Sequence, residues 1–343
     1  MMRCLDLARC GLGTTYPNPQ VGSVIVRHGK IIAEGFHRRS GEPHAEALAI
    51  AAVKDKSLLK GSSLYVSLEP CSHFGKTPPC ADLIVSSGIP RVVVGTLDTS
   101  KKVAGKGIGI LRAGGCEVVT GVLEKECRRI NRRFFTWHEK SRPYIILKWA
   151  ESADGFMDRK RNPDDSSGPD WISGPLGRQL VHKWRSEEQS ILVGTRTAQI
   201  DDPSLTVREW TGRQPLRLVI DRKLSLPETL NLFNDKAPTL IFNSRLNRPD
   251  SQPEYIKLDF NGDIIDQILE VLYQRQIQSV IIEGGADTIE RFIKKELWDE
   301  ARVFTGKMRF YDGIQAPRLA FQVEESVHLH DSVCDIYFRE SDR

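Results

Sequence analysis

One histidine and two cysteines in the first half of the chain have residue types and spacing that suit a metal ion. His44 follows Pro43 at the predicted start of a helix, Cys71 follows a predicted strand, and Cys80 opens the next predicted helix. One imidazole and two thiolates bind zinc tetrahedrally and leave the fourth position open, which is the catalytic arrangement. A helix N-terminus also lowers the pKa of a cysteine, which favours the thiolate that the metal requires.

An acidic residue stands close to these predicted ligands. Glu46 is two residues after His44, and from the helix it can reach the open coordination position. There it would carry protons between a zinc-bound water, whose pKa falls to about 7, and a leaving amine. His-x-Glu followed by Pro-Cys-x-x-Cys is the pattern of zinc deaminases, although eight residues rather than two separate the cysteines here. The insert contains His73, a competing ligand, and a structural zinc knuckle is the alternative interpretation.

The second half of the chain has a weaker motif. It contains no G-x-G-x-x-G after a predicted strand, and the glycines of residues 105–109 lie in the first half with the wrong spacing. The better candidate is the run 281–288, where a predicted buried strand passes through Gly284 and Gly285 into a helix. The free N–H groups of such a helix start can bind a pyrophosphate, although an ordinary strand-to-helix turn would look the same.

Alternating strands and helices must position both sets of residues. In the first half we predict strands at 21–26, 30–34, 63–68, 91–95 and 117–119, and helices at 44–53, 81–86 and about 124–140. This alternation predicts a mainly parallel sheet covered on both faces. A proline at 143 ends the last helix and places the domain boundary at 141/142.

A second α/β pattern fills residues 142–343. Strands are predicted at 144–148, 190–193, 216–220, 239–242 and 279–283, and helices at 175–186 and 287–296. The last forty residues alternate like antiparallel strands. We therefore predict two α/β domains, residues 1–141 and 142–343.

Composition excludes several classes of protein. The 343 residues are 40% hydrophobic and 27% charged, with a net charge of +4. They contain no apolar run long enough to span a membrane, which argues against disordered, fibrous and membrane proteins. Seven cysteines without a signal peptide indicate reduced thiols in the cytoplasm. The slight positive charge suits small phosphate-bearing ligands and argues against a nucleic-acid partner.

Several motifs together resemble a known family. The sequence resembles the bacterial bifunctional riboflavin-biosynthesis deaminase/reductases. The matching runs in the first half are 17–19, 21–22, 41–46, 69–80 and 103–107. Those in the second half are 147–150, 154–155, 171–173, 201–208 and 283–285. The resemblance covers nearly the whole chain. It implies an N-terminal cytidine-deaminase-like α/β/α domain followed by a dihydrofolate-reductase-like α/β domain that uses NADPH, and a homo-oligomer.

The resemblance also implies roles for individual residues. His44, Cys71 and Cys80 would bind Zn²⁺, and Glu46 would be the catalytic proton shuttle. Substrate contacts are implied at Asn18, His37, Lys76 and Asp98 in the first domain and at Arg185, Leu205, Arg208 and Glu283 in the second. Cofactor contacts are implied at Ala150, Trp171, Thr197, Asp201, Gly284, Gly285, Ala286, Asp287, Thr288, Ile289 and Glu290, and we add Arg222 as a partner for the 2′-phosphate of NADPH.

The implied reactions are consecutive steps of riboflavin synthesis. The first is hydrolytic deamination of 2,5-diamino-6-(5-phosphoribosylamino)pyrimidin-4(3H)-one. The second is NADPH reduction of the ribosyl group of the resulting uracil to ribityl. The chain departs from the family pattern at Ser100, Pro169 and Arg222. The alternatives are a zinc deaminase of nucleosides or RNA bases with a structural second domain, and a nucleotide-binding regulator with a structural zinc.

Overall fold

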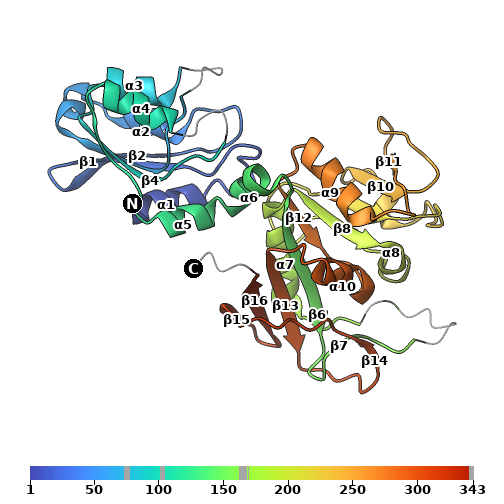
Figure 1. Cartoon of the computed structure of the whole chain (residues 1–343). Coiled ribbons are helices and arrows are strands. Elements are labelled where there is room, and N and C mark those ends of the chain that lie inside the picture. The colour runs from blue at the N-terminus through green and yellow to red at the C-terminus, as the bar shows by residue number, and fades with distance from the viewer. Residues whose placement is uncertain (73–77, 101–104, 162–167, 169, 340–343) are drawn as a thin grey trace. The chain divides into compact units, whose positions relative to one another are not determined.

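The computed structural model describes residues 1–72, 78–100, 105–161, 168 and 170–339, and the chain forms two compact units (Figure 1). The first unit comprises Met1–Ser141 and the second begins at Arg142. Among the described residues, no helix is both long and apolar enough to cross a membrane.

The first unit is built on a five-stranded sheet in the order β2-β1-β3-β4-β5. Its strands are β1 (Gly22–Arg27), β2 (Lys30–Phe36), β3 (Ser63–Leu68), β4 (Arg91–Thr96) and β5 (Glu117–Val119). The predicted hairpin is present, because β1 pairs antiparallel with β2. β1 also pairs antiparallel with β3, whereas β3, β4 and β5 are parallel. The sheet is therefore evenly mixed rather than mainly parallel.

Helices cover both faces of this sheet (Figure 1). They are α1 (Met2–Arg9), α2 (Ala45–Ala52), α3 (Cys80–Ser86), α4 (Lys106–Ala113), α5 (Glu124–Ile130) and α6 (Arg132–Lys140), with a 3₁₀ turn at Lys56–Gly61. Apolar residues of α2, α3 and α4 pack on one face of the sheet. On the other face, a Cβ at Gly22 would lie 2.0 Å from the carbonyl oxygen of Cys4, so glycine allows α1 to pack closely against β1.

One predicted helix is wrong in its length. The basic segment 124–140 is two helices, α5 and α6, which are interrupted at Asn131. The buried Asn131 side chain accepts a hydrogen bond from the backbone N–H of Gln20 and donates one to its carbonyl oxygen. A tertiary contact therefore determines this break, and the local sequence carries no sign of it.

The second unit contains a nine-stranded sheet in the order β11-β10-β9-β8-β12-β6-β13-β16-β15. The strands are β6 (Tyr144–Glu151), β8 (Ser190–Gly194), β9 (Leu216–Ile220), β10 (Thr239–Asn243), β11 (Glu254–Lys257), β12 (Ser279–Ile282), β13 (Glu300–Gly306), β15 (Glu325–His328) and β16 (Ser332–Phe338). The pairings from β11 to β13 are parallel, and β16 and β15 add an antiparallel edge, as predicted for the end of the chain. β7 (Phe156–Arg159) and β14 (Gly313–Gln315) form a separate antiparallel pair.

The helices that the described residues of this unit form are α7 (Pro175–Glu187), α8 (Thr195–Asp201), α9 (Ile264–Gln274) and α10 (Ala286–Lys294), with a 3₁₀ turn at Asn231–Phe233. Apolar residues of α9 and α10 belong to one core cluster, and those of α7 and α8 belong to another. Sequence reasoning missed α9, although its buried residues Ile265, Ile268, Leu269 and Leu272 have helical spacing and Asp263 caps its start.

Candidate metal centre and cofactor cavity

The predicted zinc ligands meet at one end of the first unit's sheet. His44 is the N-cap of α2, Cys71 lies shortly after β3, and Cys80 begins α3. The Nδ1 atom of His44 is 3.4 Å from the Sγ atom of each cysteine, and the ligand atoms all lie within 4.8 Å of one another. Tetrahedral zinc with ordinary bond lengths separates a nitrogen from a sulfur ligand by about 3.6 Å. The donor set and its spacing therefore fit a zinc ion.

The surroundings of the two cysteines favour a thiolate at Cys71, which is the form that binds a metal. The pKa of Cys71 is lowered to about 4, mainly because the Cys80 thiol donates a hydrogen bond to its sulfur, and His44 lowers it further. The backbone N–H of Cys80, at the start of α3, also donates to Cys71 Sγ at 3.3 Å. The same thiol hydrogen bond, together with burial, raises the pKa of Cys80.

Glu46 lies in the first turn of α2, immediately beside the ligands. Its side chain is buried, and burial raises its pKa to about 7. His44 lowers this pKa, and the Cys71 thiolate raises it. A carboxyl group that can be protonated or ionised near neutral pH is suited to proton transfer.

Asn18 and His37 form a connected pair next to this centre. The ring of His37 lies at 81° to that of His44, with the centroids 5.3 Å apart. His37 Nδ1 is 3.2 Å from the carbonyl oxygen of Pro43, which can only accept, so Nδ1 carries the ring proton. His37 Nε2 therefore accepts a hydrogen bond from the Asn18 amide nitrogen at 3.1 Å. Burial lowers the pKa of His37, which keeps the ring neutral.

Asp98 and Ser100 lie in the loop after β4. Asp98 is buried, and burial raises its pKa although its carboxylate accepts the backbone N–H of Ser100 at 2.7 Å. Sequence reasoning missed Glu69, whose buried carboxylate accepts the backbone N–H groups of Asp98, Gly105, Gly107 and Ile108. Glu69 thus connects Asp98 with the start of α4. The implied substrate residue Lys76, the competing ligand His73 and Pro169 lie outside the described residues.

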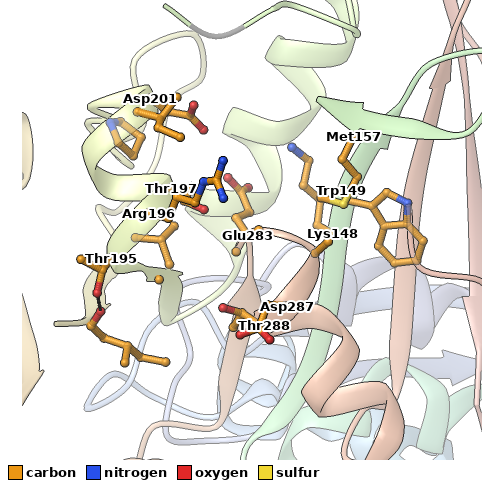
Figure 2. A pocket seen from close by; sticks show the side chains of 18 of the residues that line it. Lys148, Trp149, Met157, Thr195, Arg196, Thr197, Asp201, Glu283, Asp287 and Thr288 are labelled. Atoms are coloured by element: carbon orange, nitrogen blue, oxygen red, sulfur yellow. Dashed lines mark hydrogen bonds between the residues drawn. The ribbon is translucent and has the colours of Figure 1, made fainter. Parts of the chain in front are cut away.

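The second unit contains a cavity of about 1210 Å³ at the carboxyl ends of its central strands (Figure 2). The ends of β6, β8, β9 and β12 and the starts of α8 and α10 contribute to its wall. Parallel α/β sheets bind ligands at this edge. The implied residues that line it are Ala150, Trp171, Arg185, Thr197, Asp201, Leu205, Arg208, Arg222, Glu283, Gly284, Gly285, Ala286, Asp287 and Thr288.

Two implied cofactor residues do not line this cavity. Ile289 is fully buried in the core, and Glu290 is half-exposed and pairs with Lys294 on the same helix. Helical periodicity explains this, because residues that follow each other around a helix cannot all face the same cavity.

The start of α10 can accept an anion. Its N-cap is Gly285, and no side chain caps it. A Cβ at Gly284 would lie 2.8 Å from the Thr288 side chain, and a Cβ at Gly285 would lie 3.4 Å from Thr197 Oγ1 on α8. Glycine at 284 therefore avoids a clash with Thr288, and the uncapped helix start suits a pyrophosphate.

Charged groups converge from several elements of the cavity wall. Arg185 on α7 donates to Glu283 Oε2 at 2.7 Å, and both side chains are about one-tenth exposed. Burial raises the pKa of Glu283, but Arg185 and Lys148 outweigh it and hold the pKa below its ordinary value. The second carboxylate oxygen, Oε1, is buried and makes no hydrogen bond with the described residues. This oxygen can accept a hydrogen bond from a ligand.

Lys148 and Asp201 face the same space from opposite sides. Figure 2 shows Lys148 on β6 and Asp201 on α8, with Glu283 between them. Burial raises the pKa of Asp201 to about 6, with Asp158 adding to the shift and Arg161 and Lys148 opposing it. Sequence reasoning assigned no cavity role to His182, Arg161 or Phe260, because nothing in the local sequence places them beside the strand ends.

Comparisons with known proteins cover both units. Residues 1–96 match the family model of the cytidine and deoxycytidylate deaminase zinc-binding region, and residues 143–309 match that of the RibD C-terminal domain. The chain is 39% identical over 338 residues to the riboflavin biosynthesis protein RibD of Aquifex aeolicus, which covers 96% of this chain and 92% of the relative. It is 39% identical over 328 residues to the RibD of Bacillus amyloliquefaciens, covering 93% and 86%.

A solved structure also matches over the full length. It is the diaminohydroxyphosphoribosylaminopyrimidine deaminase/5-amino-6-(5-phosphoribosylamino)uracil reductase of Thermotoga maritima, with a TM-score of 0.88 and 35% identity. The match covers 98% of this chain and 97% of that one. A RibD structure from Acinetobacter baumannii matches with a TM-score of 0.88 and 30% identity, again over 98% and 97%.

Proposed function

The chain belongs to the RibD family of bifunctional riboflavin-biosynthesis deaminase/reductases, and from this premise we propose a substrate, a cofactor and a set of residues for each step. Residues 1–141 deaminate 2,5-diamino-6-(5-phosphoribosylamino)pyrimidin-4(3H)-one. Residues 142–343 then reduce the ribosyl group of 5-amino-6-(5-phosphoribosylamino)uracil to ribityl with NADPH.

The observation that carries the first assignment is the buried carboxyl of Glu46 beside a centre of three ligands, His44, Cys71 and Cys80. Three protein ligands leave the fourth position of a tetrahedral zinc free. Zinc in such a centre supplies a Lewis acid that lowers the pKa of water to about 7. Glu46 takes a proton from the attacking water and delivers it to the departing amine nitrogen, which leaves as ammonia. The Oδ1 atom of Asn18, held through His37, accepts from an N–H group of the pyrimidine.

The cavity carries the second assignment. At about 1210 Å³ it exceeds the range of about 300–1,000 Å³ usual for one small ligand, and it has room for a dinucleotide and a substrate together. A bound nicotinamide cofactor supplies hydride to C1′ of the ring-opened ribosyl imine. The open start of α10 binds the cofactor pyrophosphate, and Arg185 and Arg208 bind the substrate phosphate. Glu283 Oε1 accepts a hydrogen bond from the substrate.

Mass spectrometry of the products tests both assignments. The zinc-loaded protein is first incubated with the diaminopyrimidine phosphate in the absence of NADPH. We expect one amino group of this substrate to be replaced by oxygen. Addition of NADPH is expected to add two hydrogen atoms to that product. No change in the first incubation would contradict the deaminase substrate, and no further change with NADPH would contradict the reductase assignment.

Glu46→Gln tests the proton shuttle. The amide keeps the shape of the carboxyl group but cannot carry a proton, so we expect deamination to fall by about a hundredfold or more. Zinc content and NADPH-dependent reduction of added aminouracil substrate should stay at the wild-type level. Glu34→Gln, on the exposed ion pair with Arg3 in the same unit, is the matched control and should leave both activities unchanged. Unchanged deamination in Glu46→Gln would refute the shuttle.

A further inference from the structure

His182 has a place in the cavity wall that the proposed function leaves unexplained. It lies on α7, one turn before Arg185, and its side chain is 3% exposed. Even so, it lines the cavity together with Arg185, Arg208 and Glu283. Its neighbours Val181 and Trp184 pack into the core, so α7 holds the imidazole rigidly.

One hydrogen bond determines where the ring proton of His182 lies. The backbone N–H of Arg208 donates to His182 Nδ1 at 2.9 Å, so Nδ1 carries no proton. The neutral ring then carries its proton on Nε2, which makes no hydrogen bond with the residues that the structure describes. Burial lowers the pKa of His182 to about 4, and Arg185 and Arg208 lower it further while Glu209 and Glu283 oppose them. The ring is therefore a neutral donor at physiological pH.

The same hydrogen bond anchors the segment that presents Arg208. Leu205 in this segment has a left-handed backbone, with φ 52°, which is strained for a leucine. Arg185 Nη1 donates to the carbonyl oxygen of Thr206 at 3.5 Å, and Arg208 Nη1 donates to Thr206 Oγ1 at 3.1 Å. Bonds from two side chains of α7, His182 and Arg185, thus hold the segment in its bent conformation.

We propose that His182 completes the substrate-phosphate site, by anchoring the backbone of Arg208 through Nδ1 and by donating its Nε2–H to a phosphate oxygen. This rests on the assignment of Arg185 and Arg208 to the substrate phosphate. Glu283 neutralises much of the charge of Arg185, so an additional donor strengthens phosphate binding. A neutral N–H does this without placing a third positive charge beside the two guanidinium groups.

Three substitutions separate the two functions of the ring. The Oδ1 atom of His182→Asn can replace Nδ1 as acceptor, but the side chain is too short to donate from the position of Nε2. His182→Gln can donate from near Nε2 but does not accept from Arg208. His182→Phe fills the volume and does neither. His328→Asn, an exposed histidine on β15 of the same unit, is the matched control.

Calorimetric titration with ribose 5-phosphate measures the phosphate site without turnover. We expect His182→Phe to weaken binding about ten- to a hundredfold, the effect of hydrogen bonds to a charged group, and His182→Asn and His182→Gln to weaken it less. Binding of unphosphorylated ribose should not change between wild type and variants. NADPH affinity and deamination should also stay at wild-type levels. In turnover, KM for the aminouracil substrate should rise while kcat changes less than about twofold.

The outcomes distinguish this inference from the function on which it rests. Wild-type protein that does not bind ribose 5-phosphate overturns the inference, as do His182 variants that bind it as tightly as wild type. Phosphate binding that depends on His182 in a protein that does not oxidise NADPH supports the inference and refutes the reductase assignment. If His182→Phe is unfolded, weaker binding by both folded polar variants supports the inference, and unchanged binding by both overturns it.

Discussion

Replacement of Glu283 by glutamine probes the centre of the reductase cavity. The substitution keeps the shape of the side chain and removes the negative charge that faces Arg185 and Lys148. The Arg185–Glu283 contact is 2.7 Å long between side chains that are 11% and 10% exposed. Glutamine can still accept from Arg185, but the bond is no longer between opposite charges.

The structure sets the size of the expected effect on stability. A hydrogen bond to a charged group contributes about 1.5–3 kcal/mol. The lower end applies here because the pair borders a cavity that admits water, which hydrates Arg185 once its partner is neutral. We expect the free energy of unfolding to fall by about 1.5 kcal/mol and the melting temperature of the second unit by about 3–6 °C.

The pH dependence of this difference has a definite sign. The pKa of Glu283 is lowered on folding from its ordinary value of 4.5, so the ionised group stabilises the fold above that value. This contribution is lost as the pH falls through the lowered pKa. The difference between wild type and Glu283→Gln should therefore be the same at pH 7 and pH 6 and should disappear only in acid.

Activity gives the second measurement on the same variant. Glu283 Oε1 makes no hydrogen bond with the described residues, and we propose it as an acceptor for the substrate. On that proposal kcat/KM for NADPH oxidation should fall at least about tenfold. Deamination, which depends on the first unit, should not change. Glu270→Gln, an exposed glutamate on α9, is the control and should match wild type in both measurements. A Glu283→Gln protein with wild-type melting temperature and kcat/KM would refute the reasoning.

Two further substitutions test residues outside this pair. Arg222→Ala should weaken NADPH binding by about tenfold while NADH binding changes little, because a guanidinium can pair with the 2′-phosphate that only NADPH carries. Fluorescence titration measures both affinities. An equal effect on the two cofactors would contradict this role. Arg217→Met should lower the free energy of unfolding, measured by urea denaturation, by about 3 kcal/mol. The reason is that the buried guanidinium donates hydrogen bonds to the carbonyl groups of Asn231, Asn234 and Ala237. A loss below about 1 kcal/mol would show that those carbonyl groups find other partners.

Much of the fold could be predicted because it depends on local patterns. The hairpin of β1 and β2, the buried strand β12 and the helix α7 all lie close to their predicted positions. Predictions failed where a distant contact decides the structure. Asn131 divides α5 from α6 because it bonds to the backbone of Gln20, which is 111 residues away in the sequence. The missed α9 is different, since its apolar spacing and its Asp263 cap were visible in the sequence.

The metal centre and the cavity differ in what the sequence alone determined. His44, Cys71 and Cys80 stand at the ends of short elements, in motifs whose residue types already specify zinc chemistry, and the structure brings their ligand atoms within 4.8 Å. The cavity is lined by residues that range from Lys148 to Ile314 in the sequence. Family resemblance, rather than residue spacing, indicated most of the residues predicted to line it. Parallel strands bring such residues together only when the sheet forms. The neutral state of His182 and the free oxygen of Glu283 were therefore decided by tertiary structure, because burial and neighbouring charges set them.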